Sequence, residues 1–196
     1  MSGLNGVSLA DTTPQPWRNG GGTTRELLAW PEAQDWRVRV SVARIARDGP
    51  FSAYPGVHRG FAVLQGAGVV LQWTDHRLAL TADSEPHHFD GGQAPDCRLL
   101  DGPTEDLNLM LRGASGPGGL LRVRANVPWV CRGPWRGVFA TSACQLHVGS
   151  PDAGHLHDVP AGTLAWADNA DGEPWTLRTD RPLRAWWLCL AEGLPT

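Results

Sequence analysis

The distribution of glycine and proline constrains this chain more than any other feature of its sequence. The 196 residues include 24 Gly and 16 Pro, and both are spread along the whole length. Glycine raises the entropic cost of a helix, and proline removes a donor and clashes with the preceding turn. The two longest stretches without either residue, 32–48 and 69–85, read with a period of two. The sequence therefore predicts an all-β protein.

Several segments carry the alternation of a strand with one apolar face. In residues 36–43, apolar side chains alternate with Arg37, Arg39, Ser41 and Ala43, and residues 106–112 repeat the pattern. Residues 60–64 and 69–73 flank a Gln-Gly-Ala-Gly turn, which predicts a hairpin.

The segment 113–119 is rich in Gly, Pro and Ser, and it is the best internal boundary. We therefore expect an N-terminal half of residues 1–114 and a C-terminal half of residues 115–196. Short strands with frequent turns fill both, as in two small β-barrels.

Composition excludes several classes of protein. A formal net charge of −3 gives no electrostatic footprint for nucleic acid. No apolar run reaches the roughly 18 residues of a membrane span, and no basic residue precedes Arg18, so we expect a cytoplasmic protein without membrane contact. The four cysteines form no CxxC pair, which favours reduced, buried thiols. Every basic residue is Arg, so any anion site must use guanidinium groups.

Four blocks of sequence, residues 17–26, 36–43, 48–59, and 89–91 with 102–110, resemble the HutD/Ves family in order and spacing. The resemblance implies a cytoplasmic bacterial bicupin, with two double-stranded, jelly-roll-like β-barrel halves packed as one compact unit. It also implies, from some members, a link to histidine utilisation through binding of an intermediate such as formylglutamate or urocanate.

The motif blocks and the polar strand faces together supply candidate ligand-binding residues. These are Trp17, Asn19, Glu26, Arg37, Ser41, Ser52, Arg59, Asp106 and Asn108. The two arginines are expected to hold ligand carboxylates, because a planar guanidinium can bind a carboxylate through two hydrogen bonds. The asparagines and serines are expected to act as amide and hydroxyl partners, and the tryptophan as a wall. Glu26 and Asp106 are expected to orient the arginines, because a carboxylate repels an acidic ligand.

Catalytic and metal sites are weakly supported. His155 and His157 have ligand spacing, but they stand in what reads as a turn-rich connection with Asp158 as the only close carboxylate. No serine stands in a Gly-x-Ser-x-Gly elbow, and the glycines of residues 20–22 read as a tight turn rather than a phosphate loop. We therefore expect no metal, no cofactor and no catalytic set.

The leading hypothesis is a regulatory, non-enzymatic protein that binds a small anionic metabolite. The alternatives are a cupin-type enzyme acting on a small acid or sugar and a purely structural module. A homodimer formed through an exposed edge strand is left open.

Overall fold

The computed structural model describes residues 3–113, 118–150 and 152–191, and strands dominate them. Helical structure in these ranges is limited to one short 3-10 turn, η1 (Leu9–Asp11). This confirms the all-β prediction, whose physical basis is the scarcity of long segments free of Gly and Pro. Within the same ranges no helix has the length and apolar character needed to cross a membrane.

The chain divides into two compact units. The first unit is Thr12–Gly113, and the second combines the residues up to Asp11 with the C-terminal part of the chain. We expected the N-terminal half to begin at residue 1. Instead, strand β1 (Asn5–Ser8) pairs antiparallel with β16 (Thr163–Asp171) and belongs to the second unit. The expected boundary between residues 114 and 115 lies outside the described residues.

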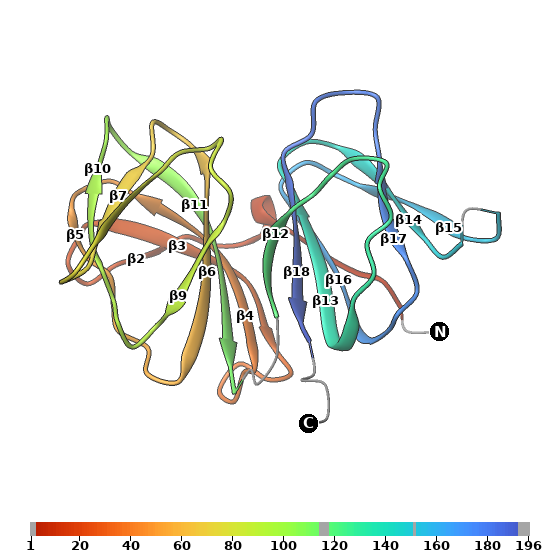
Figure 1. The fold of residues 1–196 in the computed structure, drawn as a ribbon, viewed down its shortest axis with the longest axis horizontal. Helices are drawn as coiled ribbons and strands as arrows, with labels where there is room; N and C mark the ends of the chain where they lie inside the picture. The colour runs from red at the N-terminus through yellow and green to blue at the C-terminus, as the bar shows by residue number, and fades with distance from the viewer. Residues whose placement is uncertain (1–2, 114–117, 151, 192–196) are drawn as a thin grey trace. The chain divides into compact units, whose positions relative to one another are not determined.

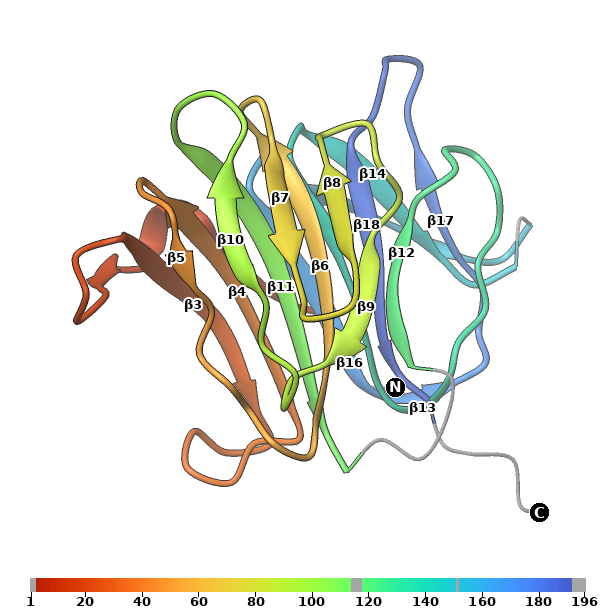
Figure 2. The same cartoon turned by 60° about the vertical axis from the view of Figure 1, so that its left-hand side comes forward.

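The first unit consists of two β-sheets that lie face to face (Figures 1 and 2). The larger sheet has six strands, in the order β2 (Gln15–Pro16), β3 (Gly22–Trp30), β4 (Val38–Ile45), β11 (Thr104–Arg112), β6 (Val57–Gln65) and β9 (His87–Asp90). The smaller sheet has four, in the order β5 (Gly49–Pro50), β10 (Asp96–Leu99), β7 (Val69–Gln72) and β8 (Arg77–Leu80). Their facing sides form a hydrophobic core that includes Ile45, Phe61, Leu71 and Cys97.

The second unit also combines a larger and a smaller sheet. The larger has the order β1, β16, β13 (Arg132–Ala140), β18 (Ala185–Leu190) and β12 (Gly119–Arg122). The smaller has the order β15 (His155–Val159), β14 (Cys144–Val148) and β17 (Trp175–Arg178). Val138, Leu146 and Leu177 pack together in the core of this unit. The same two-sheet plan thus occurs twice, as two cupin-like halves require.

The turn between β6 and β7 corrects the expected hairpin. Although the two strands are consecutive, β6 pairs with β11 and β9, whereas β7 pairs with β10 and β8. The turn therefore carries the chain from one sheet to the other. Gly66 and Gly68 have φ of +97° and +107°, and a Cβ on Gly68 would lie 2.2 Å from the Leu80 carbonyl oxygen. Glycine is needed here both for backbone conformation and for space.

Candidate functional site

A cavity of about 460 Å³ lies in the first unit, on the inner face of the larger sheet. Strands β4, β11 and β6 form its floor, and β2, β3 and the segment 50–54 complete the lining. Because β11 pairs with both neighbours, its residues define rows across the three strands. The two rows that line the cavity are Arg39–Met110–Arg59 and Ser41–Asn108–Phe61. Side chains two apart on a strand share a face, so both rows project into the same space.

Arg59 is a buried cation at this floor, with 5% of its surface exposed. Its Nη2 donates to Asn108 Oδ1 at 2.8 Å, and its guanidinium carbon lies 5.0 Å from the ring centres of both Phe51 and Phe89. The pKa of Arg59 is lowered to about 10, mainly by burial; Tyr54 opposes this shift and the charge of Arg39 adds to it, so the group stays cationic at neutral pH. Among the described residues, its buried Nε has no hydrogen-bond partner. Because an unpaired buried donor costs free energy, a ligand that supplies an acceptor for it gains binding free energy.

Arg39 supplies a second guanidinium to the same row. Its Nε donates to Glu26 Oε2 at 2.6 Å, an ion pair that fixes the orientation of the side chain. Arg39 and Arg59 occupy equivalent positions on the two strands that flank β11. Their Cα atoms are therefore about 10 Å apart, because neighbouring strands are spaced about 4.8 Å.

The rim on the β2–β3 side is built from a tight turn. Asn19 Oδ1 accepts from the Gly21 N–H at 2.9 Å, and Trp17 Nε1 donates to Thr24 Oγ1 at 2.8 Å. A Cβ on Gly22 would lie 2.2 Å from the Arg44 carbonyl oxygen, so glycine permits the close approach of the two strands. The structure thus gives the glycines next to Asn19 the tight-turn role expected of them.

The structure brings six of the nine candidate residues to the cavity. These six are Trp17, Asn19, Ser41, Ser52, Arg59 and Asn108. Glu26 pairs with Arg39, rather than with Arg37 or Arg59, the arginines that it was expected to orient. Arg37 and Asp106 require correction.

Arg37 does not line the cavity. It is exposed and precedes β4, and its backbone N–H donates to the Trp30 carbonyl oxygen at 2.7 Å in the β3–β4 turn. The cavity ends at the row that contains Arg39. The alternating pattern places Arg39 on the polar face of its strand, but Arg39 was not among the predicted binding residues. The signal for Arg39 was its position two residues before Ser41. Phe51 and Tyr54 were also missed, because nothing local marks an aromatic loop residue as a wall.

Asp106 was expected to orient the arginines, but its carboxyl group accepts a hydrogen bond from Thr104 instead. It is fully buried in the next row, between Ala43 and Val63, and its Oδ2 accepts from Thr104 Oγ1 at 2.8 Å. Its Oδ1 has no partner in the described part of the chain. Burial raises the pKa of Asp106 to about 8, although the hydrogen bond from Thr104 opposes this shift. Asp106 is therefore a largely neutral acid at pH 7.

The cavity lining suits an anion and does not suit a metal cation. It contains two guanidiniums at its floor but no His, Cys, Asp or Glu side chain. No group of three or more such residues in the described ranges could hold a metal ion. His155 and His157 lie on strand β15 rather than in the expected turn-rich connection, which corrects that reading.

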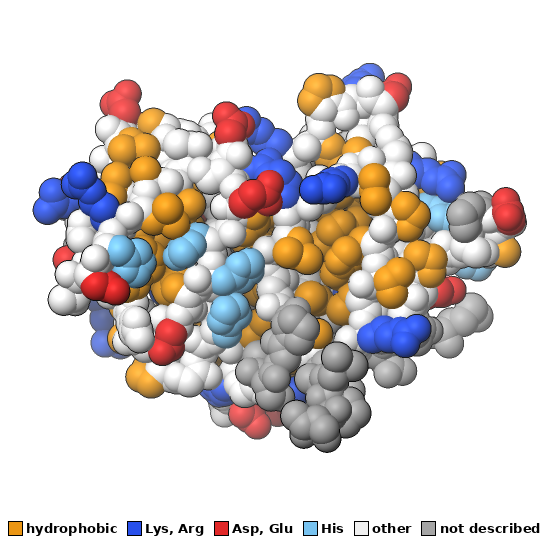
Figure 3. Space-filling view, in the orientation of Figure 1, with side chains coloured by type: hydrophobic (Ala, Val, Ile, Leu, Met, Phe, Trp, Pro, Cys, Tyr) orange, Lys and Arg blue, Asp and Glu red, His pale blue; other side chains and the backbone are white. Residues whose placement is uncertain are grey.

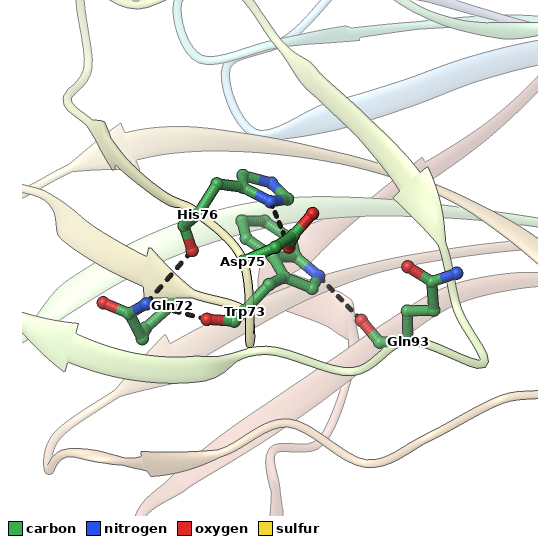
Figure 4. Close-up of polar contacts among 5 residues, drawn as sticks. All are labelled: Gln72, Trp73, Asp75, His76 and Gln93. Atoms are coloured by element: carbon green, nitrogen blue, oxygen red, sulfur yellow. Dashed lines mark hydrogen bonds and ion pairs between the residues drawn. The ribbon is translucent and has the colours of Figure 1, made fainter.

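A second hollow, of about 520 Å³, lies at the turn between β7 and β8 (Figure 4). Trp73 Nε1 donates to the Gln93 carbonyl oxygen at 2.8 Å, and Asp75 pairs with His76 Nδ1 at 2.7 Å. Its lining contains Asp75 and Asp96 but no Arg, so it repels anions.

The first unit also shows a group of histidines on one face (Figure 3). Among these side chains, the rings of His58 and His88 stack at 5.5 Å. None of these histidines lines the larger sheet's cavity. The cavity at Arg39 and Arg59 is therefore the candidate site.

Comparison with known proteins agrees with this architecture. The chain is 37% identical over 98 residues to protein Ves of Escherichia fergusonii, which is 49% of this chain and 51% of that protein. The chain thus spans about half the length of the curated relatives it matches.

Two solved structures share the fold. HutD from Pseudomonas fluorescens SBW25 superposes with a TM-score of 0.78 at 23% identity, over 95% of this chain and 97% of that one. A variant of oxalate decarboxylase from Bacillus subtilis superposes with a TM-score of 0.64 at 12% identity, over 100% of this chain and 79% of that one. These likenesses establish the fold, which is that of a protein with two cupin halves.

The family model described as HutD matches residues 9–183, a range that includes the cavity and most of both units. The chain therefore belongs to the HutD family.

Proposed function

We propose that this chain is a regulatory, non-enzymatic binding protein whose cavity holds a small anionic metabolite. The observation that carries the proposal is Arg59, a buried guanidinium with an Nε that has no partner among the described residues, at the floor of the cavity. A ligand carboxylate beside this guanidinium would neutralise the cation and, once the side chain turns Nε toward the cavity, accept a hydrogen bond from it. Such a role belongs in the bacterial cytoplasm, where metabolic intermediates are found.

The ligand that fits best is a small dicarboxylate with an amide, of which formylglutamate is the example. Two arginines about 10 Å apart can each receive one carboxylate. Asn108 and Ser41 lie in the next row and offer partners for an amide. Urocanate, with a single carboxylate, would use only one of the two arginines. The family resemblance to proteins of histidine utilisation supports both compounds as candidates.

Calorimetric titration of the full chain with formylglutamate, urocanate and glutamate tests the proposal. We expect formylglutamate to bind most tightly, and Arg59→Ala or Arg39→Gln to weaken it about 10- to 100-fold, the usual worth of a charged hydrogen bond. Arg37→Gln is the matched control, since it removes the same charge two residues outside the cavity. The proposal fails if no acid binds the folded protein, or if Arg37→Gln weakens binding as much as Arg39→Gln.

A cupin-type enzyme acting on a small acid or sugar is the competing function. General acid-base catalysis needs a titratable donor and acceptor near the substrate. The cavity lining offers only arginines and the Tyr54 phenol as titratable groups. Incubation of each acid with the protein, followed by proton NMR, separates the two functions, because turnover of any of them would favour the enzyme.

A further inference from the structure

Two pairs of side chains connect the segment 129–131 with the segment 187–189 of strand β18 in the second unit. The Trp129 ring stacks on Trp187, with ring centres 4.7 Å apart and planes within 5°. Two residues further along each segment, Cys131 packs against Cys189. Trp129 also packs against the two cysteines, so the stacked rings lie beside the contact between the thiols.

The environment of these thiols differs from that of the other cysteines. Cys131 and Cys189 are both buried and share a hydrogen bond, which lowers the pKa of Cys189 and raises that of Cys131. Arg136, which pairs with Cys189 across β13 and β18, lowers the pKa of Cys131 and so opposes part of the rise there. The hydrogen bond between the thiols makes Cys189 the one that ionises more readily and leaves Cys131 as a protonated neighbour.

Cys97 and Cys144 have no such arrangement. Each lies in a separate apolar cluster, Cys97 in the first unit and Cys144 in the second. Burial raises the pKa of Cys97 to about 12 and that of Cys144 to about 11. These two thiols are natural internal controls.

We propose that Cys131 and Cys189 are a site of reversible oxidation, at which a peroxide converts the contacting thiol pair into a disulfide within the second unit. The Cys189 thiolate attacks one peroxide oxygen, the O–O bond breaks, and hydroxide leaves, which gives a sulfenic acid. Cys131 then attacks that sulfur, the S–S bond forms, and the S–O bond breaks. In sum, two thiols are oxidised, one hydrogen peroxide is reduced, and two waters form.

Mass spectrometry of the intact, reduced protein after treatment with hydrogen peroxide tests the site. We expect a loss of two hydrogen masses, a peptide linking Cys131 to Cys189, and full recovery with dithiothreitol. The bond joins two residues that are 58 positions apart in the sequence, so the melting temperature of the oxidised protein should rise by several degrees.

Serine variants assign the roles. Cys131→Ser should stop at a sulfenic acid on Cys189 that dimedone traps, whereas Cys189→Ser should remain largely reduced. Cys97→Ser and Cys144→Ser should form the disulfide as the wild type does. Four free thiols in wild-type protein after peroxide treatment, or a disulfide through Cys97 or Cys144, would overturn the proposal. The measurement on wild-type protein does not depend on whether a variant folds.

Discussion

Two buried ionisable residues of the first unit differ in charge, since Arg59 is cationic and Asp106 is largely protonated. Arg59 keeps its charge because Asn108 accepts from it and aromatic faces lie near its guanidinium. Asp106, on the neighbouring strand, holds its proton because it is buried and the hydrogen bond from Thr104 does not offset that burial. The alternating pattern placed Asp106 on the polar face of its strand, whereas Arg59 was expected at the end of a loop and lies instead on β6. Neither expectation revealed the depth of the two side chains, which depends on how far the cavity extends down the strands.

Asp106→Asn should stabilise the protein increasingly as pH rises. The folded pKa of about 8 lies above the unfolded value, so between about pH 4 and 8 the folded state holds the extra proton and wild-type stability falls with pH. An asparagine side chain can accept the same hydrogen bond from Thr104, and it does not titrate, so its contribution to stability does not change with pH. The slope reaches at most about 1.4 kcal/mol per pH unit.

Thermal denaturation of both proteins measures this effect. The difference in melting temperature should be small near pH 5 and should amount to several degrees near pH 8. An equal difference at both pH values would show that Asp106 is ionised in the folded state.

At the scale of elements, the sequence predicts where strands lie along the chain better than it predicts which strands pair with each other. The alternation in residues 36–43 anticipates most of β4 (Val38–Ile45) because the pattern is local. The row that joins Arg39 to Arg59 depends on β11 inserting between β4 and β6, which are separated from it by tens of residues. The same limit explains the mistaken hairpin, since a Gly-rich turn does not reveal whether the strands it connects share a sheet.

Gly68→Ala tests the sheet-crossing turn, with Gly56→Ala as its matched control. Both glycines have positive φ, but only at Gly68 would the new Cβ collide with backbone, whereas Gly56 has open space around it. We expect Gly56→Ala to cost about 1–2 kcal/mol, the strain of a left-handed residue. Gly68→Ala should cost clearly more. Urea unfolding measures both, and equal losses would remove the steric explanation.

At the scale of the whole molecule, the two units share a plan, and each has a buried arginine on its larger sheet in a different setting. The last strand of each unit lies between two neighbours, β11 between β4 and β6, and β18 between β12 and β13. Arg59 on β6 lines the cavity, whereas the guanidinium carbon of Arg136 on β13 lies 4.4 Å from the centre of the Trp175 ring. Composition predicted two similar halves. It could not show that one arginine would reach a cavity while the other would pack on a tryptophan ring, because such contacts are made between residues far apart in the sequence.

Deletion of residues 1–11 should lower the stability of the protein without weakening its binding of a ligand. The deletion removes β1, whose four residues pair with β16, so the melting temperature should fall. Every residue that lines the cavity lies between Gln15 and Met110, so the affinity for a bound acid should stay within a factor of about two. A large loss of affinity in a protein that is still folded would contradict this independence.

The pairing of β1 with β16 also sets an order of events during synthesis. Residues 5–8 leave the ribosome before their partners, residues 163–166, which are made some 155 residues later. At typical elongation rates, strand β1 therefore lacks its partner for roughly 8 to 30 seconds. The first unit, residues 12–113, is synthesised completely before then. Strand β1 must therefore stay available until β16 arrives.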